Sequence, residues 1–156
     1  MVEPPPPEGD YVTSLRTWAT GHHPPLLAVE IVSPSRPDKD YGSSPHKYAA
    51  SGTQELWVFD PNLAGPAVQG GPFRLQVWRR DEKGLFARVY AGEGPVLSDA
   101  VGGWVFAVDE GRSLAIADDA EGTRWWTTPE EAERAAKEEA LRRVAELEAL
   151  LAARKA

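Results

Sequence analysis

Two short apolar runs separated by a polar connection organise the first half of the chain. Residues 26–32 are apolar apart from Glu30, and residues 55–61 form the second run. Their length, β-branched content and terminal prolines are typical of buried strands. Between them, residues 45–51 hold proline only at the first position and are followed by Gly52, a pattern that predicts a short helix. The predicted order is strand, loop, helix, strand.

The second half of the chain contains shorter apolar segments. Residues 73–79 alternate apolar and polar side chains, residues 81–84 have the composition of a turn, and residues 85–91 return as another strand. This arrangement predicts a β-hairpin. Further short strands are expected at residues 104–108 and 114–117.

The final segment has the strongest helical pattern. Thr128 stands at an N-cap position, and a Pro-Glu-Glu sequence fills the expected first turn, where proline and acidic side chains are favourable. The apolar positions that follow repeat at spacings of four, three and four; they are Ala140, Val144, Leu147 and Leu151. This pattern predicts a long C-terminal helix that forms a short coiled coil or packs on a partner.

Composition narrows the functional classes. With 156 residues and 42% apolar content, the chain suffices for one modest domain and an appendage. The formal net charge of −7 argues against a broad basic surface for nucleic acid, but not against a local groove. The chain has no cysteine, which excludes disulfides and thiolate metal sites, and no apolar span of membrane length. A cytoplasmic protein is expected.

Glu30 is the residue in this pattern that most needs an explanation. A charged carboxylate within a buried strand costs several kcal/mol unless a cation or a lysine compensates it. Such partners occur in catalytic sites as well as in structural ones. Two alternatives stand: Glu30 belongs to a site for metal-assisted chemistry, or it extends from an edge strand and pairs with a nearby base.

The motifs between residues 25 and 61 resemble one family. The segment Glu30-Ile31-Val32-Ser33-Pro34-Ser35 ends a strand, Asp40 precedes a helix with a lysine and a tyrosine, and a Glu-Leu-Trp-Val-Phe-Asp-Pro strand follows. This order and spacing are similar to those of restriction endonucleases of the Uma-two type, members of the PD-(D/E)XK nuclease superfamily. The later hairpin and the terminal helix also resemble one branch of that family, so the resemblance covers most of the chain.

The resemblance implies a fold and a domain organisation. The fold is expected to be α/β, in the broader α+β sense: a partial restriction-endonuclease-like mixed sheet, extended by the β-hairpin and by a long C-terminal α-helix. Residues 1–10 are expected to form a proline-rich tail, residues 11–120 the nuclease-like domain, and residues 121–156 the terminal helix.

The resemblance also implies a chemistry. Nucleases of this superfamily hold Mg²⁺ or Mn²⁺ with two carboxylates, and a lysine orients the attacking water. Glu30 is thereby implied as a metal ligand and catalytic residue. The superfamily pattern places the lysine two residues after the strand carboxylate, where this chain has Val32. Members of this family usually carry it on the following helix, where this chain has Ser44. Lys47, one turn further on the same helical face, is implied instead; a solvated surface lysine is the alternative. Asp40 is expected to cap the helix or to assist the site.

The second metal carboxylate is missing from its family position. Relatives supply it from an earlier strand with a Pro-Asp pair, whereas Asp10 is the one aspartate upstream of Glu30, and Leu26 stands where many relatives have a further aspartate. A single carboxylate binds Mg²⁺ weakly. We therefore expect a chain that lacks the family's N-terminal portion and cleaves DNA weakly or not at all.

Three functional hypotheses follow from the sequence, of which a stress or assembly protein organised mainly by the terminal helix leaves Glu30 unexplained. The first is a metal-dependent DNA endonuclease. The second is a catalytically inactive relative that associates with DNA or with other proteins. A homo-oligomer, formed through the sheet or through the C-terminal helix, is the expected assembly.

Overall fold

A mixed four-stranded sheet forms the centre of the protein. The computed structural model describes residues 23–155, so that the proline-rich tail and Asp10 lie outside the described residues. The sheet has the strand order β1-β2-β3-β4, with β1 parallel to β2 and the other neighbours antiparallel. Its strands are β1 (Leu27–Ile31), β2 (Glu55–Phe59), β3 (Leu75–Arg80) and β4 (Phe86–Gly92). Together with the helices described below, this mixed sheet confirms the α+β fold class.

A helical segment connects β1 to β2. It begins as a π-helix, η1 (Lys39–Ser43), and continues as the α-helix α1 (Ser44–Ser51). Gly52 ends α1 with a φ of 90°, a left-handed conformation that glycine adopts without steric cost. A side chain at Gly52 would also meet Pro24, whose Cγ lies 2.9 Å from the position of a Cβ atom. The predicted helix and its glycine stop are confirmed.

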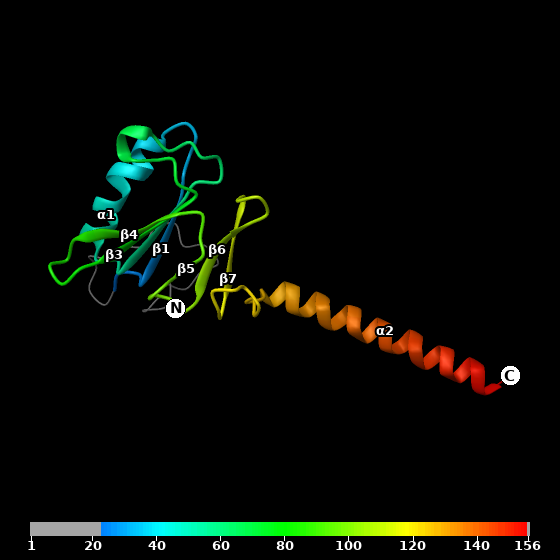
Figure 1. Ribbon diagram of the computed structural model, residues 1–156. Coiled ribbons are helices and arrows are strands. Elements are labelled where there is room, and N and C mark those ends of the chain that lie inside the picture. The colour runs from blue at the N-terminus through cyan, green and yellow to red at the C-terminus, as the bar shows by residue number, and fades with distance from the viewer. Residues whose placement is uncertain (1–22, 156) are drawn as a thin grey trace, which may run out of the picture. The chain divides into compact units, whose positions relative to one another are not determined.

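The helical segment covers one face of the central sheet, and a second sheet covers the other (Figure 1). On the helical face, Tyr41 packs in a buried cluster with Leu56 and Val58. On the opposite face, Val105 packs against Trp57 and Val77. The second sheet has the order β5-β6-β7 and consists of β5 (Val96–Leu97), β6 (Trp104–Val108) and β7 (Ser113–Ala117). Side chains of alternate positions along β2 therefore enter two separate cores.

The hairpin and the later strands agree with the sequence predictions. β3 and β4 pair as an antiparallel hairpin with an irregularity between Val77 and Trp78. A short 3₁₀ helix, η2 (Ala67–Gln69), lies in the connection between β2 and β3. β6 and β7 occupy the segments for which short strands were expected.

β1 corrects one expectation. Within the described residues, β1 is hydrogen-bonded to β2 alone, and Val29 and Ile31 are 44% and 64% exposed. The strand with every side chain buried is β2. The prediction of a buried strand at residues 26–32 is therefore wrong. An apolar run of strand length does not distinguish an edge strand from a central one, because the neighbours of the strand decide its burial.

The C-terminal helix, α2 (Pro129–Lys155), belongs to a separate compact unit, residues 125–156. Its start has the predicted cap. The Thr128 N–H donates to Glu131 Oε2 at 2.8 Å, and the Glu131 N–H donates to Thr128 Oγ1 at 3.2 Å. This reciprocal pair of hydrogen bonds is a capping box. No helix in the described part of the chain is both long and apolar enough to cross a membrane.

Candidate active site

Glu30 faces the helical layer from β1. The strand register pairs Glu30 with Val58 and Val58 with Gln76, so these three side chains form a row across one face of the sheet. Val58 belongs to the core cluster beneath η1 and α1, which identifies the face. Because Glu30 stands at the end of this row, its side chain remains 17% exposed. The carboxylate is thus held at the border between the core and solvent.

Three side chains from the helical segment gather around Glu30. The Lys39 ammonium lies 3.2 Å from Glu30 Oε1, and the Tyr48 hydroxyl donates a hydrogen bond of 2.9 Å to Glu30 Oε2. The same ammonium lies 3.3 Å from Oδ1 of Asp40. Asp40 is almost fully buried, and its Oδ2 accepts a hydrogen bond of 2.9 Å from the backbone N–H of Ser33. We call Glu30 and Asp40 the carboxylate pair.

The carboxylate pair shifts the titration of its neighbours. Its hydrogen bonds raise the pKa of the Lys39 ammonium above the ordinary value, and Glu30 is the larger contributor. Burial raises the pKa of Tyr48, and the hydrogen bond to Glu30 raises it further. At neutral pH, Lys39 is therefore cationic and Tyr48 is a neutral donor. The cluster contains two carboxyl groups that face a single ammonium.

The structure places the other predicted residues differently. Lys47 is exposed on α1, and none of the ion pairs of residues 23–155 includes it; its catalytic role stays a prediction. Asp40 lies within η1, and neither η1 nor α1 has a side-chain cap, so the capping role expected for Asp40 is wrong. Leu26 is 54% exposed, just before β1.

Lys39 is the residue that the sequence analysis missed. It enters the site because the chain turns after β1 and begins a π-helix, which presents Lys39 and Asp40 beside the end of the strand. A helical period of 3.6 residues does not predict a π-helix, which has five-residue hydrogen bonds. The available indication was the direct adjacency of a lysine and an aspartate after the Ser-Pro-Ser turn.

Two other acidic residues of the motif are structural. Glu55 is 2% exposed and Asp60 is 0% exposed, and each is surrounded by hydrogen-bond donors of the protein. The donors to Glu55 are Trp57 Nε1 at 2.7 Å, Arg79 Nε at 3.0 Å, the Asp99 N–H at 3.0 Å and the Ser98 hydroxyl. The donors to Asp60 are the Tyr41 hydroxyl at 3.0 Å and the N–H groups of Ala64 at 3.0 Å and Gly65 at 2.8 Å. Oxygens with this many fixed donors are poorly placed to take a metal.

The carboxylate pair has the chemistry of a magnesium ligand set. Mg²⁺ is commonly held by one or two carboxylates and retains several waters. Glu30 Oε1 and Asp40 Oδ1 already enclose a positive charge, the ammonium of Lys39. The described residues contain no group of three or more His, Cys, Asp or Glu side chains that could hold a metal ion. Among the described residues, Glu30 and Asp40 are the carboxylates that could hold a metal at this site.

Both alternatives drawn for Glu30 from the sequence find support in this geometry. Glu30 lies on an edge strand of the described sheet and pairs with a nearby base, as the structural alternative expected. The base is also a lysine that contacts a second carboxylate, and two carboxylates with a lysine are the groups that the resemblance implies for a metal-dependent site. The ion pair with Lys39 thus does not decide between them.

A comparison with models of protein families identifies the family of the chain. The family model Uma2, described as a putative restriction endonuclease, matches residues 3–109. The match contains the carboxylate pair, the whole four-stranded sheet and β6. Neither the comparison with curated proteins nor that with solved structures found a match. Because the matched region exceeds half of the sequence, the chain belongs to the Uma2 family of putative restriction endonucleases.

Proposed function

We propose that this protein is a DNA endonuclease that requires Mg²⁺ or Mn²⁺, with Glu30 and Asp40 as the metal ligands and Lys39 as the amine of the active site. The observation that carries the proposal is the contact of both carboxylates with one ammonium, at 3.2 and 3.3 Å. The family supports a nuclease, and the superfamily chemistry joins two carboxylates, a divalent metal and a lysine.

The side chains around the carboxylate pair have separate tasks in this proposal. Tyr48 fixes one oxygen of Glu30, and the Ser33 N–H fixes one oxygen of Asp40, so that Oε1 and Oδ1 remain directed at the cation. A bound divalent metal would supply Lewis acidity toward the scissile phosphate and lower the pKa of a water. Lys39 is 49% exposed at its side chain, and its flexible chain allows the ammonium to leave the carboxylates and pair with a phosphate oxygen.

The same geometry supports weak activity. Two carboxylates bind Mg²⁺ less tightly than the richer ligand sets of high-affinity sites, because affinity rises with ligand charge. The Lys39 ammonium also occupies the space between the two oxygens and competes with the metal. This competition favours the second candidate as well, a nuclease-fold protein that associates with DNA or proteins without cleavage.

Nicking of supercoiled plasmid DNA separates the two functions. With Mn²⁺, we expect slow nicking that EDTA abolishes and that Glu30→Gln and Asp40→Asn each reduce by roughly 100-fold. Lys39→Gln should also reduce the rate. Lys47→Gln tests the lysine that the sequence implied, and a loss of rate in Lys47→Gln but not in Lys39→Gln would assign the amine to Lys47. The matched control is Glu82→Gln, in the exposed hairpin turn.

Two results would contradict the proposed endonuclease activity at this site. Nicking that persists in Glu30→Gln would remove this site from the reaction. A folded wild-type protein that binds DNA but does not nick it under any of these conditions would establish the non-cleaving function instead.

We also propose that α2 joins two copies of the chain as a parallel pair of helices. Leu141, Val144 and Leu147 are 61%, 52% and 56% exposed on it. With Val144 and Leu147 in the core positions of a heptad, Arg143 and Glu148 take the flanking positions that form ion pairs between parallel helices. Sedimentation of the full chain should show a dimer, and removal of residues 129–156 should give a monomer. A monomer at high concentration in both cases would disprove the pairing.

A further inference from the structure

A cleft of about 470 Å³ lies between the helical segment and the β3–β4 hairpin. Its walls come from η1 and α1, from Gln69 of η2, and from Trp78, Phe86 and Arg88 of the hairpin. Neither member of the carboxylate pair lines it. The volume lies within the range of small-molecule sites. This cleft is therefore a second place on the helical face of the sheet where a ligand has room to bind.

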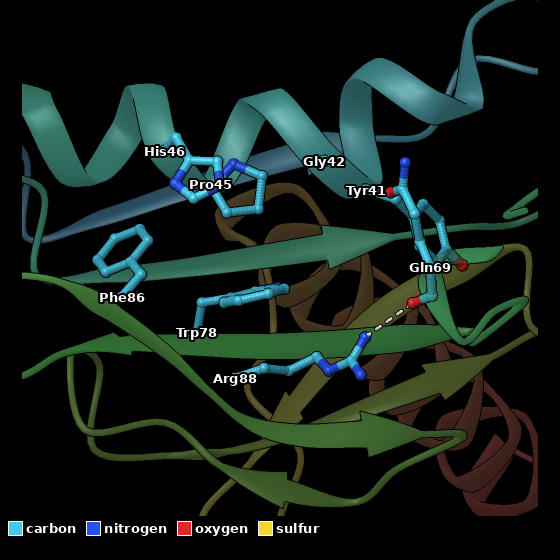
Figure 2. A pocket seen from close by; sticks show the side chains of 8 residues that line it. All are labelled: Tyr41, Gly42, Pro45, His46, Gln69, Trp78, Phe86 and Arg88. Carbon is cyan, nitrogen blue, oxygen red and sulfur yellow. Dashed lines mark hydrogen bonds between the residues drawn. The ribbon is translucent and has the colours of Figure 1, made fainter.

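Trp78 forms a platform within the cleft. Figure 2 shows its ring edge-on, with Arg88 on one side and Pro45 of α1 on the other. The guanidinium carbon of Arg88 lies 5.5 Å from the centre of the Trp78 ring and 5.2 Å from that of Phe73, so Arg88 stacks on both aromatic residues. Arg88 occupies one face of the Trp78 ring, and the other face points toward Pro45, which also lines the cleft (Figure 2). A flat ligand has an aromatic surface on which to stack there.

Polar groups at the cleft lack partners. Gln69 Oε1 and Trp78 Nε1 are buried without a hydrogen bond within the described part of the chain. Buried polar atoms are nearly always paired, so an unpaired acceptor and an unpaired donor on two cleft residues need an explanation. Arg88 donates to the carbonyl oxygen of Gln69 at 3.4 Å and to Gln76 Oε1 at 3.2 Å, and no ion pair of the described residues gives it a carboxylate. Its charge is therefore available to an anion.

We propose that this cleft binds a nucleotide, with the base stacked on Trp78 beneath Pro45, a polar edge of the base at Gln69, and the phosphate at Arg88. A simple anion would meet Arg88 but leave the aromatic platform and Gln69 unused. An apolar ligand would leave the charge of Arg88 without a counterion. A nucleotide supplies a flat aromatic face, hydrogen-bonding groups and a negative charge together. A free mononucleotide and a nucleotide of a single DNA strand share this chemistry.

The proposal is independent of metal-assisted cleavage, because it uses none of the residues of the carboxylate pair. Titration calorimetry of the full chain tests it with four deoxynucleoside 5′-monophosphates, with inorganic phosphate and with a single-stranded DNA dodecamer. We expect saturable binding of at least one monophosphate or of the dodecamer, and the binding probe identifies the source. Arg88→Gln should weaken it by about tenfold or more. The matched control Arg112→Gln, an exposed arginine of the second sheet region, should bind as the wild type does.

Two further measurements keep the test decisive if Arg88→Gln disturbs folding. Gln69→Leu removes the unpaired acceptor at a partly exposed position, and it should weaken the monophosphate more than inorganic phosphate. The indole N–H resonance of Trp78, assigned from a Trp78→Phe variant, should shift on binding. Absence of saturable binding at millimolar ligand, equal binding in folded Arg88→Gln, or equal affinity for phosphate and for every nucleotide would each overturn the proposal.

Discussion

The central sheet and the helical segment beside it carry two kinds of acidic residue. Glu55 begins β2, and Asp60 follows it directly. Glu30 lies on β1, and Asp40 lies in η1. Glu55 and Asp60 are buried among fixed donors that include backbone N–H groups. Each member of the carboxylate pair has one fixed donor, the Tyr48 hydroxyl for Glu30 and the Ser33 N–H for Asp40. Their remaining oxygens share the half-exposed ammonium of Lys39. Fixed donors thus hold both oxygens of Glu55 and of Asp60, whereas one oxygen of Glu30 and one of Asp40 face a cation that can move.

The two kinds of carboxylate are suited to different roles, one structural and one chemical, although both belong to the same sequence motif. A carboxylate among fixed donors cannot move without leaving those donors unpaired, which costs about 1–3 kcal/mol for each buried group. A carboxylate that is paired with a flexible lysine can exchange the lysine for a metal at smaller cost. The family motif contains acidic residues of both kinds, so membership in the motif does not identify the reactive ones.

The largest expected effect is a loss of folding stability when Glu55 is replaced. We expect Glu55→Gln to lower the free energy of unfolding by about 3 kcal/mol, because it turns an amide toward several buried donors and leaves Arg79 with the exposed Asp99 as its carboxylate partner. Urea unfolding would measure the loss. Glu82→Gln, in the exposed turn, is the control and should change stability by less than about 0.5 kcal/mol. A loss at Glu55 no larger than the control would contradict a framework role.

The corresponding change in the carboxylate pair should cost far less stability. For Glu30→Gln we expect a loss of at most about 1 kcal/mol, since the amide oxygen still accepts the hydrogen bond from Tyr48. The same urea experiment measures it. If Glu30→Gln destabilised the protein as much as Glu55→Gln does, Glu30 would have the same structural role as Glu55. The proposed difference between the two kinds of acidic residue would then be wrong.

The smallest expected effect is on the titration of the two tyrosines that contact these carboxylates. Burial raises the pKa of Tyr41 to about 12 from 10.0, with a further contribution from Asp60. The folded state therefore keeps a proton that the unfolded chain loses near pH 10. The resulting stabilisation is complete below that pH and disappears as the pH rises toward 12. Absorbance at high pH should show a late ionisation that Tyr41→Phe removes and Tyr48→Phe retains; an ordinary pKa for Tyr41 would contradict its framework position.

Local sequence patterns predicted most of the fold. The Gly52 stop, the Thr128 cap and the alternation of the hairpin depend on neighbours along the chain, and the structure confirms each of them. The burial of β1 could not be predicted in this way, because it depends on which strands lie beside it.

The candidate site was predictable only in part. Glu30 was recognisable as a charge within an apolar run. Its partner Lys39 was not, because a turn and a π-helix bring it back to the strand. The structural role of Glu55 was also hidden, since Arg79, Ser98 and Asp99 reach it from distant parts of the sequence.

Binding of Mn²⁺ to the full chain tests the account of the carboxylate pair most directly. Titration calorimetry should show weak binding by the wild type and none by Glu30→Gln or Asp40→Asn. Lys39→Gln should bind Mn²⁺ more tightly than the wild type, because it removes the competing ammonium and leaves both carboxylates in place. Equal Mn²⁺ binding by wild type and Glu30→Gln, or weaker binding by a folded Lys39→Gln, would contradict it.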